Sequence, residues 1–188
     1  LFAMDIRNVQ LTQFVDGGSG RILTNAGRGL SYGAEATVGL RPVDGLSVDI
    51  NYGFTHATFR DYDAGTDNQG QAVNYRGRFI PYVPQHTFSV GASYTLNLPG
   101  RWVNQMTFAA QYTGAGRIFW TEANDLRQPF YGLLNAKVAF RHDFVRLELW
   151  GRNLLATDYG AFYFESFGRS FLQRGKPLTC GANLVFAF

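Results

Sequence analysis

The last eleven residues of the chain alternate strictly between apolar side chains and small or polar ones. Apolar residues occupy every second position from Leu178 to Phe188, with residues such as Thr179 and Asn183 between them. Because successive side chains of a β-strand point to opposite faces, this pattern predicts a strand with one apolar face. A strand that also ends on an aromatic residue is typical of the closing strand of a barrel whose outer face meets lipid.

Seven earlier segments carry the same pattern or part of it. In residues 87–97, for example, Phe88 and Val90 alternate with Ser89 and Gly91. Each segment approaches the roughly 9–11 residues that a tilted strand needs to cross a bilayer. The first segment alternates poorly after Ile6. The predicted strands are 2–15, 29–41, 46–55, 87–97, 102–113, 130–141, 144–155 and 178–188.

Composition decides how such a chain can cross a membrane. Hydrophobic residues make up 46% of the chain, yet the mean hydropathy is −0.13. No run of about 18 apolar residues occurs, so the sequence offers no transmembrane helix. A β-barrel avoids that requirement, because alternation averages the hydropathy of its strands. We therefore expect an all-β fold, an antiparallel transmembrane β-barrel segment of about eight strands.

A soluble β-sandwich or a lipocalin-like barrel is the alternative fold, since its strands alternate as well. Such a protein needs a polar outer face. Here the face rich in Gln, Asn, Thr, Arg and Glu is expected to point inward, which suits a wet or plugged lumen.

The connections between the predicted strands alternate in length, and this pattern predicts their orientation. Short turns are expected at 42–45, 98–100 and 142–143, and long loops at 16–28, 56–86, 114–129 and 156–176. Bacterial barrels have short periplasmic turns and long extracellular loops. Large aromatic residues gather near both ends of the predicted strands, as in the interfacial belts of membrane barrels.

Enzymatic chemistry finds no support in the sequence. The three histidines, His56, His86 and His142, belong to no catalytic or zinc-binding motif, and the single cysteine, Cys180, falls on an apolar strand face. A formal charge of +3 does not favour nucleic acid as a partner. We therefore expect no enzyme, no catalytic residues, no metal site and no cofactor.

Several short motifs occur in a definite order over most of the chain. They are Asn25–Arg28 followed by Gly33–Glu35, Arg41–Leu46, Pro81–His86, Trp150–Leu155 followed by Asp158–Tyr159, Gly175–Pro177 and the terminal Phe188. Any one of them is weak, but together they resemble, in order and spacing, the motifs in the C-terminal part of a TonB-dependent receptor. The stretch Thr157–Tyr159 is one residue shorter than the Asp-x-x-Tyr motif of the family.

The resemblance implies that residues 1–188 are the C-terminal β-barrel segment of a larger receptor, about the last eight of 22 strands. The start at Leu1, without an initiator Met or leader, fits a mature fragment that lacks the plug domain and the earlier strands. The family implies uptake of a siderophore-like iron complex across the bacterial outer membrane with energy from TonB. Outer-membrane lipid, lipopolysaccharide and the barrel-assembly machinery would be further partners.

Other functions stay open at this point. A passive porin or a structural outer-membrane barrel is favoured if the gene encodes no plug. An outer-membrane enzyme would need a catalytic constellation. TonB-dependent import of a glycan or a vitamin keeps the transporter class and changes the substrate.

Two groups of residues are candidates for function. Aromatic rings and arginines in the long loops would suit an anionic, ring-bearing iron chelate, although they could equally pack the loops or touch lipopolysaccharide. The ligand-binding candidates are Tyr75, Arg76, Arg78, Phe119, Trp120, Tyr163 and Phe164. The membrane-assembly signal is expected at Gly181, Leu184, Phe186 and Phe188. The inward-facing Arg146, Glu148 and Arg152 either face the plug or pair within a wet lumen.

Overall fold

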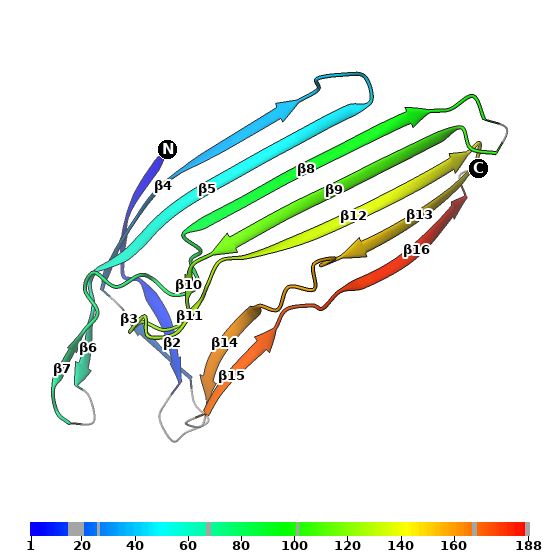
Figure 1. The fold of residues 1–188 in the computed structure, drawn as a ribbon. Helices are drawn as coiled ribbons and strands as arrows, with labels where there is room; N and C mark the ends of the chain where they lie inside the picture. Colours follow the sequence, from blue (N-terminus) through cyan, green and yellow to red (C-terminus); the bar gives the residue numbers. More distant parts are fainter. Residues whose placement is uncertain (15–20, 26, 67–68, 101, 167–168, 187–188) are drawn as a thin grey trace.

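A computed structural model of the chain describes residues 1–14, 21–25, 27–66, 69–100, 102–166 and 169–186. Every regular element among them is a β-strand. Eight strands form one antiparallel sheet in the order β1-β4-β5-β8-β9-β12-β13-β16 (Figure 1). They are β1 (Phe2–Arg7), β4 (Arg28–Leu40), β5 (Leu46–Asp61), β8 (His86–Asn97), β9 (Gln105–Gly116), β12 (Tyr131–His142), β13 (Val145–Arg152) and β16 (Thr179–Phe186).

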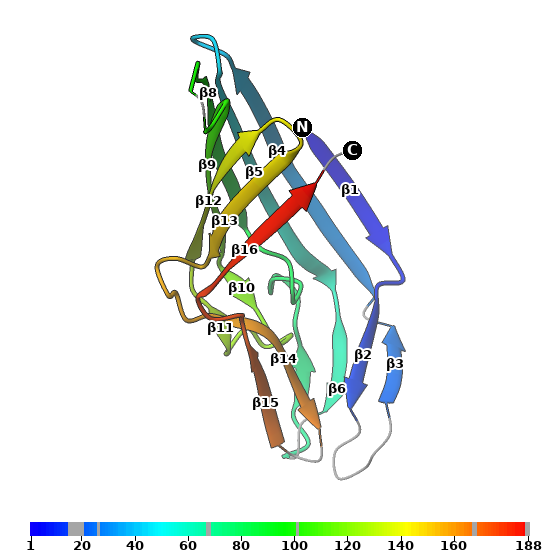
Figure 2. The ribbon, with the colours of Figure 1, turned by 90° about the vertical axis from the view of Figure 1, so that its right-hand side faces the viewer.

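The predicted all-β, antiparallel fold is confirmed, and the sheet is a curved segment rather than a closed barrel. Figure 2 shows the curvature, with β1 and β16 at its two edges. Within the described residues these edge strands do not pair with each other. The same part of the chain contains no helix with the length and apolar character needed to span a membrane.

Several predicted strands differ in their bounds from those in the structure. The predicted segment 102–113 corresponds to β9 at Gln105–Gly116, the predicted segment 144–155 corresponds to β13 at Val145–Arg152, and two other segments differ more. The first predicted segment is divided, because Asn8 adopts a φ of 55° between β1 and the next strand. The third predicted segment continues beyond Thr55 to Asp61, since its extension still pairs with β4, as Tyr32 does with His56. The pattern of alternation changes there because Phe59, which pairs with Gly29 in β4, also packs against Tyr62 in the loops.

The register gathers large apolar side chains on one face of the sheet. Ile50 lies between Val38 and Val90 in the neighbouring strands, and Val138 pairs with Leu149. Val38, Val90 and Leu149 are exposed to the surroundings of the sheet. An apolar face that no other layer covers is what a lipid-facing barrel wall presents.

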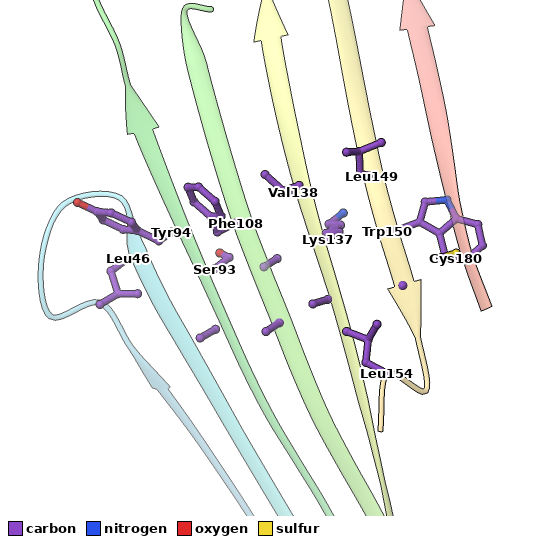
Figure 3. A pocket seen from close by; sticks show the side chains of 15 residues that line it. Leu46, Ser93, Tyr94, Phe108, Lys137, Val138, Leu149, Trp150, Leu154 and Cys180 are labelled. Carbon is purple, nitrogen blue, oxygen red and sulfur yellow. The ribbon is translucent and has the colours of Figure 1, made fainter. Parts of the chain in front are cut away.

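An open depression of about 680 Å³ lies on this apolar face. Figure 3 shows the side chains that line it. It forms because a row of small residues crosses neighbouring strands beside a row of larger ones. The larger side chains are Tyr94, Phe108, Val138 and Leu149, and the small residues include Ala92, Ala110, Ala136 and Gly151.

The opposite face is polar and held by side-chain hydrogen bonds between strands. The hydroxyl oxygens of Ser47 and Ser93 lie 2.8 Å apart. Lys137 Nζ donates to Glu148 Oε2 at 3.3 Å, and Arg146 Nη2 donates to the same oxygen at 2.8 Å. The two faces therefore have the opposite characters that the alternation predicted.

The two ends of the sheet also differ. At one end the strands are joined by short turns at 41–45, 98–104 and 143–144. Gly45 adopts a φ of +80°, and a Cβ there would lie 2.3 Å from the Thr95 carbonyl oxygen, so the close approach requires glycine.

At the other end, four small two-stranded hairpins extend from the sheet (Figure 1). They are β2 (Gln10–Phe14) with β3 (Arg21–Asn25), β6 (Asp63–Thr66) with β7 (Ala72–Asn74), β10 (Ile118–Phe119) with β11 (Arg127–Gln128), and β14 (Gly160–Ser166) with β15 (Arg169–Arg174). Most buried large apolar side chains of the described chain lie at this end.

Candidate ligand-binding loops

The first aromatic cluster forms where β5 leaves the sheet. Phe59 and Tyr62 are each 1% exposed, and their ring centroids lie 4.9 Å apart. Tyr75, which follows β7, packs its ring edge-on against Tyr62 at 5.4 Å. Val9 and Ile80 complete the cluster. Tyr75, predicted as a ligand contact, is therefore half-buried and joins the β6–β7 hairpin to β5.

Arg76 and Arg78 lie in a tight turn beside this cluster. The Arg76 amide donates to Asn74 Oδ1 at 2.8 Å, and the Phe59 amide donates to the Arg78 carbonyl at 2.9 Å. Gly77 between them has a φ of +80°. Both arginines are exposed. Their backbone is thus fixed while their guanidinium groups reach solvent.

The second cluster joins the loop between β9 and β12 to the β14–β15 hairpin. Ile118, Trp120 and Tyr163 are buried together, and Tyr131 packs against them. Phe119 is also buried, at 7% exposure. Three predicted ligand contacts, Phe119, Trp120 and Tyr163, therefore form the interior of the loops.

The two clusters are joined by the segment that leads into β8. Phe79 stacks on Phe119 with centroids 5.2 Å apart and planes 10° from parallel. The Phe79 amide donates to Asn124 Oδ1 at 2.6 Å, and Asn124 Nδ2 returns a bond to the Phe79 carbonyl at 2.9 Å. Asn124 has a φ of 58°, which asparagine tolerates better than most residues.

Arg117 strengthens this junction. Its guanidinium carbon lies 5.8 Å from the Phe79 centroid and 5.5 Å from the Phe119 centroid. Its Nε and Nη2 both donate to Gln85 Oε1, at 3.0 and 2.7 Å. Gln85 is buried, and the guanidinium group of Arg117 is occupied by contacts within the protein. Arg117 therefore has a structural role rather than a ligand-binding one.

Tyr82 ties three loops together. Its amide donates to the Phe119 carbonyl at 2.8 Å, and its hydroxyl donates to the Tyr163 carbonyl at 2.7 Å. Its ring lies 5.5 Å from that of Trp120 and 5.7 Å from that of Phe162. The sequence places Tyr82 in a long loop but does not identify it as a functional residue. Its hydroxyl contacts Tyr163, which lies 81 residues further along the chain, and a sequence pattern does not reveal such a contact.

Four neighbouring rings, which we call the aromatic ladder, are those of Tyr82, Phe162, Phe164 and Phe171, and Phe164 among them is half-buried. Phe162 and Phe164 have centroids 6.0 Å apart, and Phe164 stacks on Phe171 at 5.0 Å with planes 12° from parallel. Tyr82, Phe162 and Phe171 are 46%, 45% and 42% exposed. Of the ladder only Phe164 was predicted as a ligand contact. The ladder is an aromatic surface of the loops that is open to solvent.

The half-buried carboxyl of Glu122 lies in the loop between β9 and β12. Burial raises the pKa of the Glu122 carboxyl, and the neighbouring Glu165 and Asp125 raise it further. Burial, together with the charge of Glu122, raises the pKa of Tyr62 to about 12. The same two causes raise the pKa of Tyr82. An anionic ligand therefore suits the exposed arginines better than this interior.

The terminal strand holds the predicted assembly residues. Gly181 lies under the indole of Trp150, and a Cβ there would be 2.5 Å from Trp150 Cζ2, so glycine makes room for the ring. Leu184 and Phe186 are exposed on the apolar face at the edge of the sheet. Phe188 lies outside the described residues. Among the described residues no three His, Cys, Asp or Glu side chains gather to hold a metal ion.

Comparison with known proteins gives a family and a set of similar folds. A family model described as "TonB dependent receptor-like, beta-barrel" matches residues 1–154. The fold is similar to the ferric yersiniabactin uptake receptor FyuA from Yersinia pestis, with a TM-score of 0.80, 20% identity, and coverage of 99% of this chain and 26% of that protein.

Two further solved structures are similar over almost the whole chain. The siderophore receptor PiuA from Acinetobacter baumannii has a TM-score of 0.73 at 16% identity and covers 98% of this chain and 25% of that protein. The ferric-catecholate import receptor Fiu from E. coli K12 has a TM-score of 0.63 at 19% identity, with coverage of 97% and 23%. The chain thus spans about a quarter of the length of these proteins.

Proposed function

This chain belongs to the TonB-dependent receptor-like β-barrel family, and on that premise we propose that it is part of an outer-membrane receptor that imports an iron complex. The family is one of receptors and transporters rather than enzymes. The three similar structures are named for ferric yersiniabactin, for a siderophore and for ferric catecholates. These names support siderophore-like cargo here, and TonB would supply the energy.

The observation that carries the proposal is the division of the sheet into two ends and two faces. One face is apolar and suits the lipid and lipopolysaccharide of the outer membrane, while the other is polar and suits a lumen. The long hairpins lie together at one end and would form the extracellular surface. The short turns at the other end would face the periplasm.

The rest of the receptor would lie outside residues 1–188. We place the plug domain, the contact with TonB and the earlier barrel strands there, because the chain covers only about a quarter of its structural relatives. In this arrangement β1 and β16 pair with strands that precede residue 1. The barrel-assembly machinery would read the terminal strand through Gly181, Leu184, Phe186 and Phe188.

Within the loops the predicted ligand residues have two different roles in our proposal. Arg76 and Arg78 are exposed and supply cationic donors to an anionic chelate. Phe164 presents its ring within the aromatic ladder. Phe119, Trp120 and Tyr163 are buried and hold the surface in place, as the half-buried Tyr75 does for the arginine turn.

Uptake by the intact receptor tests this function. Cells that depend on the full-length protein are grown under iron limitation with a panel of ferric complexes of catecholate, hydroxamate and carboxylate type. The double variant Arg76→Ala/Arg78→Ala should weaken binding of an anionic complex at least about tenfold, because each charged hydrogen bond contributes roughly 1.5–3 kcal/mol. The matched control is Arg41→Ala/Arg141→Ala, which removes two arginines near the short turns.

The same cells, given glycans, vitamins and small solutes beside the ferric panel, separate the alternatives. Uptake of a glycan or a vitamin in place of every iron complex would keep the transporter and change the substrate. Diffusion of small solutes without dependence on TonB would identify a porin. If the true substrate is imported equally by the Arg76→Ala/Arg78→Ala variant, these two arginines do not contact it.

Assembly is tested separately by removing Phe188 from the full-length protein. We expect lower insertion into the outer membrane, measured as heat-modifiable barrel in purified membranes. Val43→Ala, an apolar truncation in a short turn, is the control, because it leaves the terminal strand intact and should insert normally. Unchanged insertion without Phe188 would remove the assembly role.

A further inference from the structure

The β14–β15 hairpin, which extends from the loop end of the sheet, has two faces of different character (Figure 2). The register pairs Phe164 of β14 with Phe171 of β15. Ser166 and Arg169 form the next pair on the same face, because the side chains of a strand alternate. Tyr163 lies on the other face and is buried against the loop between β9 and β12. One face therefore packs on the loops, while the other carries rings of the aromatic ladder.

The hairpin also separates its charges between these two faces. On the packed face, the Tyr163 hydroxyl donates to Glu165 Oε1, so this carboxylate lies beside the loop interior. On the ladder face, Arg169 is exposed and occupies the position next to Phe171 along that side of β15. Within the described residues Arg169 forms no ion pair. The aromatic face of the hairpin therefore ends in a positive charge that no carboxylate of the described chain neutralises.

The rings of the ladder are fixed by contacts within the protein. Tyr82 is held at both of its ends, because its amide donates to the Phe119 carbonyl at 2.8 Å and its hydroxyl to the Tyr163 carbonyl at 2.7 Å. Phe164 stacks on Phe171 with centroids 5.0 Å apart. A ligand that binds rings already held in place does not have to order them, which lowers the entropic cost of binding.

An exposed row of rings that ends in an arginine favours one chemical class of ligand. Neighbouring apolar side chains that remain exposed in water mark binding surfaces. An aryl ring of a ligand gains stacking energy on such rings beyond the energy of its buried area, and an aliphatic chain does not. The guanidinium group of Arg169 can donate to an anionic oxygen carried by that aryl ring. The charge and the rings of this face thus match an anionic ligand that bears aryl groups.

We propose that the aromatic ladder and Arg169 form a subsite that selects ferric chelates with aryl rings, of the catecholate or phenolate type, over aliphatic hydroxamate and carboxylate chelates. A ligand ring stacks on the ladder at Phe171, and its anionic oxygen accepts a hydrogen bond from Arg169. The inference rests on the proposed function in that the cargo is an iron complex, and it adds the chemical class of that complex. Arg76 and Arg78 would bind the charge of any anionic chelate, whereas the ladder distinguishes chelates by their rings.

Binding of two anionic complexes to the purified full-length receptor tests the subsite by calorimetry. The aryl probe is ferric tris(catecholate), and the second probe, ferric citrate, is anionic but has no ring. Phe162→Leu/Phe171→Leu keeps an apolar side chain at both positions and removes two exposed rings. It should weaken binding of the tris(catecholate) at least about fivefold and leave ferric citrate unchanged. Leu172→Ala, an exposed apolar position on the packed face of the hairpin, is the matched control and should change neither.

The arginine is tested by a second set of variants that alters no ring. Arg169→Gln should weaken binding of the tris(catecholate) about tenfold, while Arg169→Lys, which keeps the charge, should weaken it less. Arg174→Gln is the matched control on the same strand, because the Arg174 guanidinium already pairs with Asp158. Heat-modifiable migration confirms that each variant is a folded barrel, and hydrogen exchange of the β14 and β15 amides confirms that the hairpin is retained.

Loss of tris(catecholate) binding without loss of ferric citrate binding supports the subsite. Equal losses for both complexes, or wild-type affinity for the tris(catecholate) in both sets of variants, overturn it. Iron uptake by cells that carry the wild-type receptor is scored separately. Import of a citrate or hydroxamate complex by a receptor that does not bind the tris(catecholate) overturns the subsite and keeps the proposed function. Selective binding of the tris(catecholate) without import of any iron complex supports the subsite and contradicts the proposed function.

Discussion

The eight-stranded sheet and the loop assembly at its end are stabilised in different ways. Strands of the sheet are held by backbone ladders and leave both faces uncovered, with Val38 and Leu149 exposed on the apolar side. The loops bury their own aromatic side chains, and Phe59 and Tyr62 are the most completely enclosed large residues of the described chain. The sheet therefore depends on its surroundings, whereas the loops carry their own core.

This difference has a functional consequence. A ligand-binding surface at the mouth of a barrel needs a fixed shape in water, where no lipid supports it. Tyr82, which contacts both Phe119 and Tyr163, gives the loops that shape by joining three of them. The rings of the aromatic ladder are therefore held in place by the buried side chains of the loops beneath them.

The largest effect is expected from emptying the loop core. Phe59→Ala should lower the local stability of the β6–β7 hairpin by about 3–5 kcal/mol, the usual range for a buried Phe. Hydrogen exchange of the Gly77 amide, which donates to the Phe59 carbonyl at 2.8 Å, reports that opening in the full-length protein. The exposed Leu155→Ala is the control. Opening of the sheet in step with the hairpin would show that the two regions share one core.

The sheet should respond to charge on its apolar face instead. Arg at Val90 or Leu149 should destabilise the barrel by about 2–4 kcal/mol if the position is near the bilayer midplane. Arg at Ser89 or Asn135, on the polar face, should have a much smaller effect. Urea unfolding in lipid vesicles measures the difference. Equal effects on both faces would contradict a lipid-facing wall and favour a soluble sandwich.

The sheet could be predicted from the sequence because its strands and turns are determined by residues close together in the chain. Period-two alternation fixed the face of residues such as Val90 and Ser89, and turn signals such as Pro42–Gly45 separated the strands. The same reasoning failed where β5 continues to Asp61, since the apolar alternation ends there and Phe59 packs against Tyr62 of the loops.

The loops could be predicted only in outline. Aromatic and basic residues were identified by type, but type does not tell a buried ring from an exposed one. Trp120 and Tyr163 are buried through contacts between segments far apart in sequence, while Phe162 and Phe171 are exposed. The role of the seven chosen residues in ligand binding stays a prediction.

A smaller effect is expected at the junction of the loops. Tyr82→Phe keeps the ring on Phe162 but removes the hydroxyl that donates to the Tyr163 carbonyl at 2.7 Å. The loss should be about 0.5–1.5 kcal/mol, as for an ordinary hydrogen bond. Protection of amides in β14 and β15 measures it. Tyr94→Phe, on the apolar face of the sheet, should leave those amides unchanged, and an equal loss there would argue against the junction.

The smallest expected effect is a change in the stability of the loops with pH. It comes from Glu122 in the loops and should be absent for a carboxyl in the sheet. Burial raises the pKa of Glu122 in the folded loops above its ordinary value of 4.5. The folded loops therefore hold this proton more tightly than the unfolded chain, and their stability falls as the pH rises from about 4.5 through the folded pKa. Glu122→Gln should flatten that fall, measured by hydrogen exchange around Trp120 between about pH 4 and 8. Glu35→Gln in the sheet should leave the loop profile unchanged. A wild-type profile in the Glu122 variant would mean that another group governs the pH response of the loops.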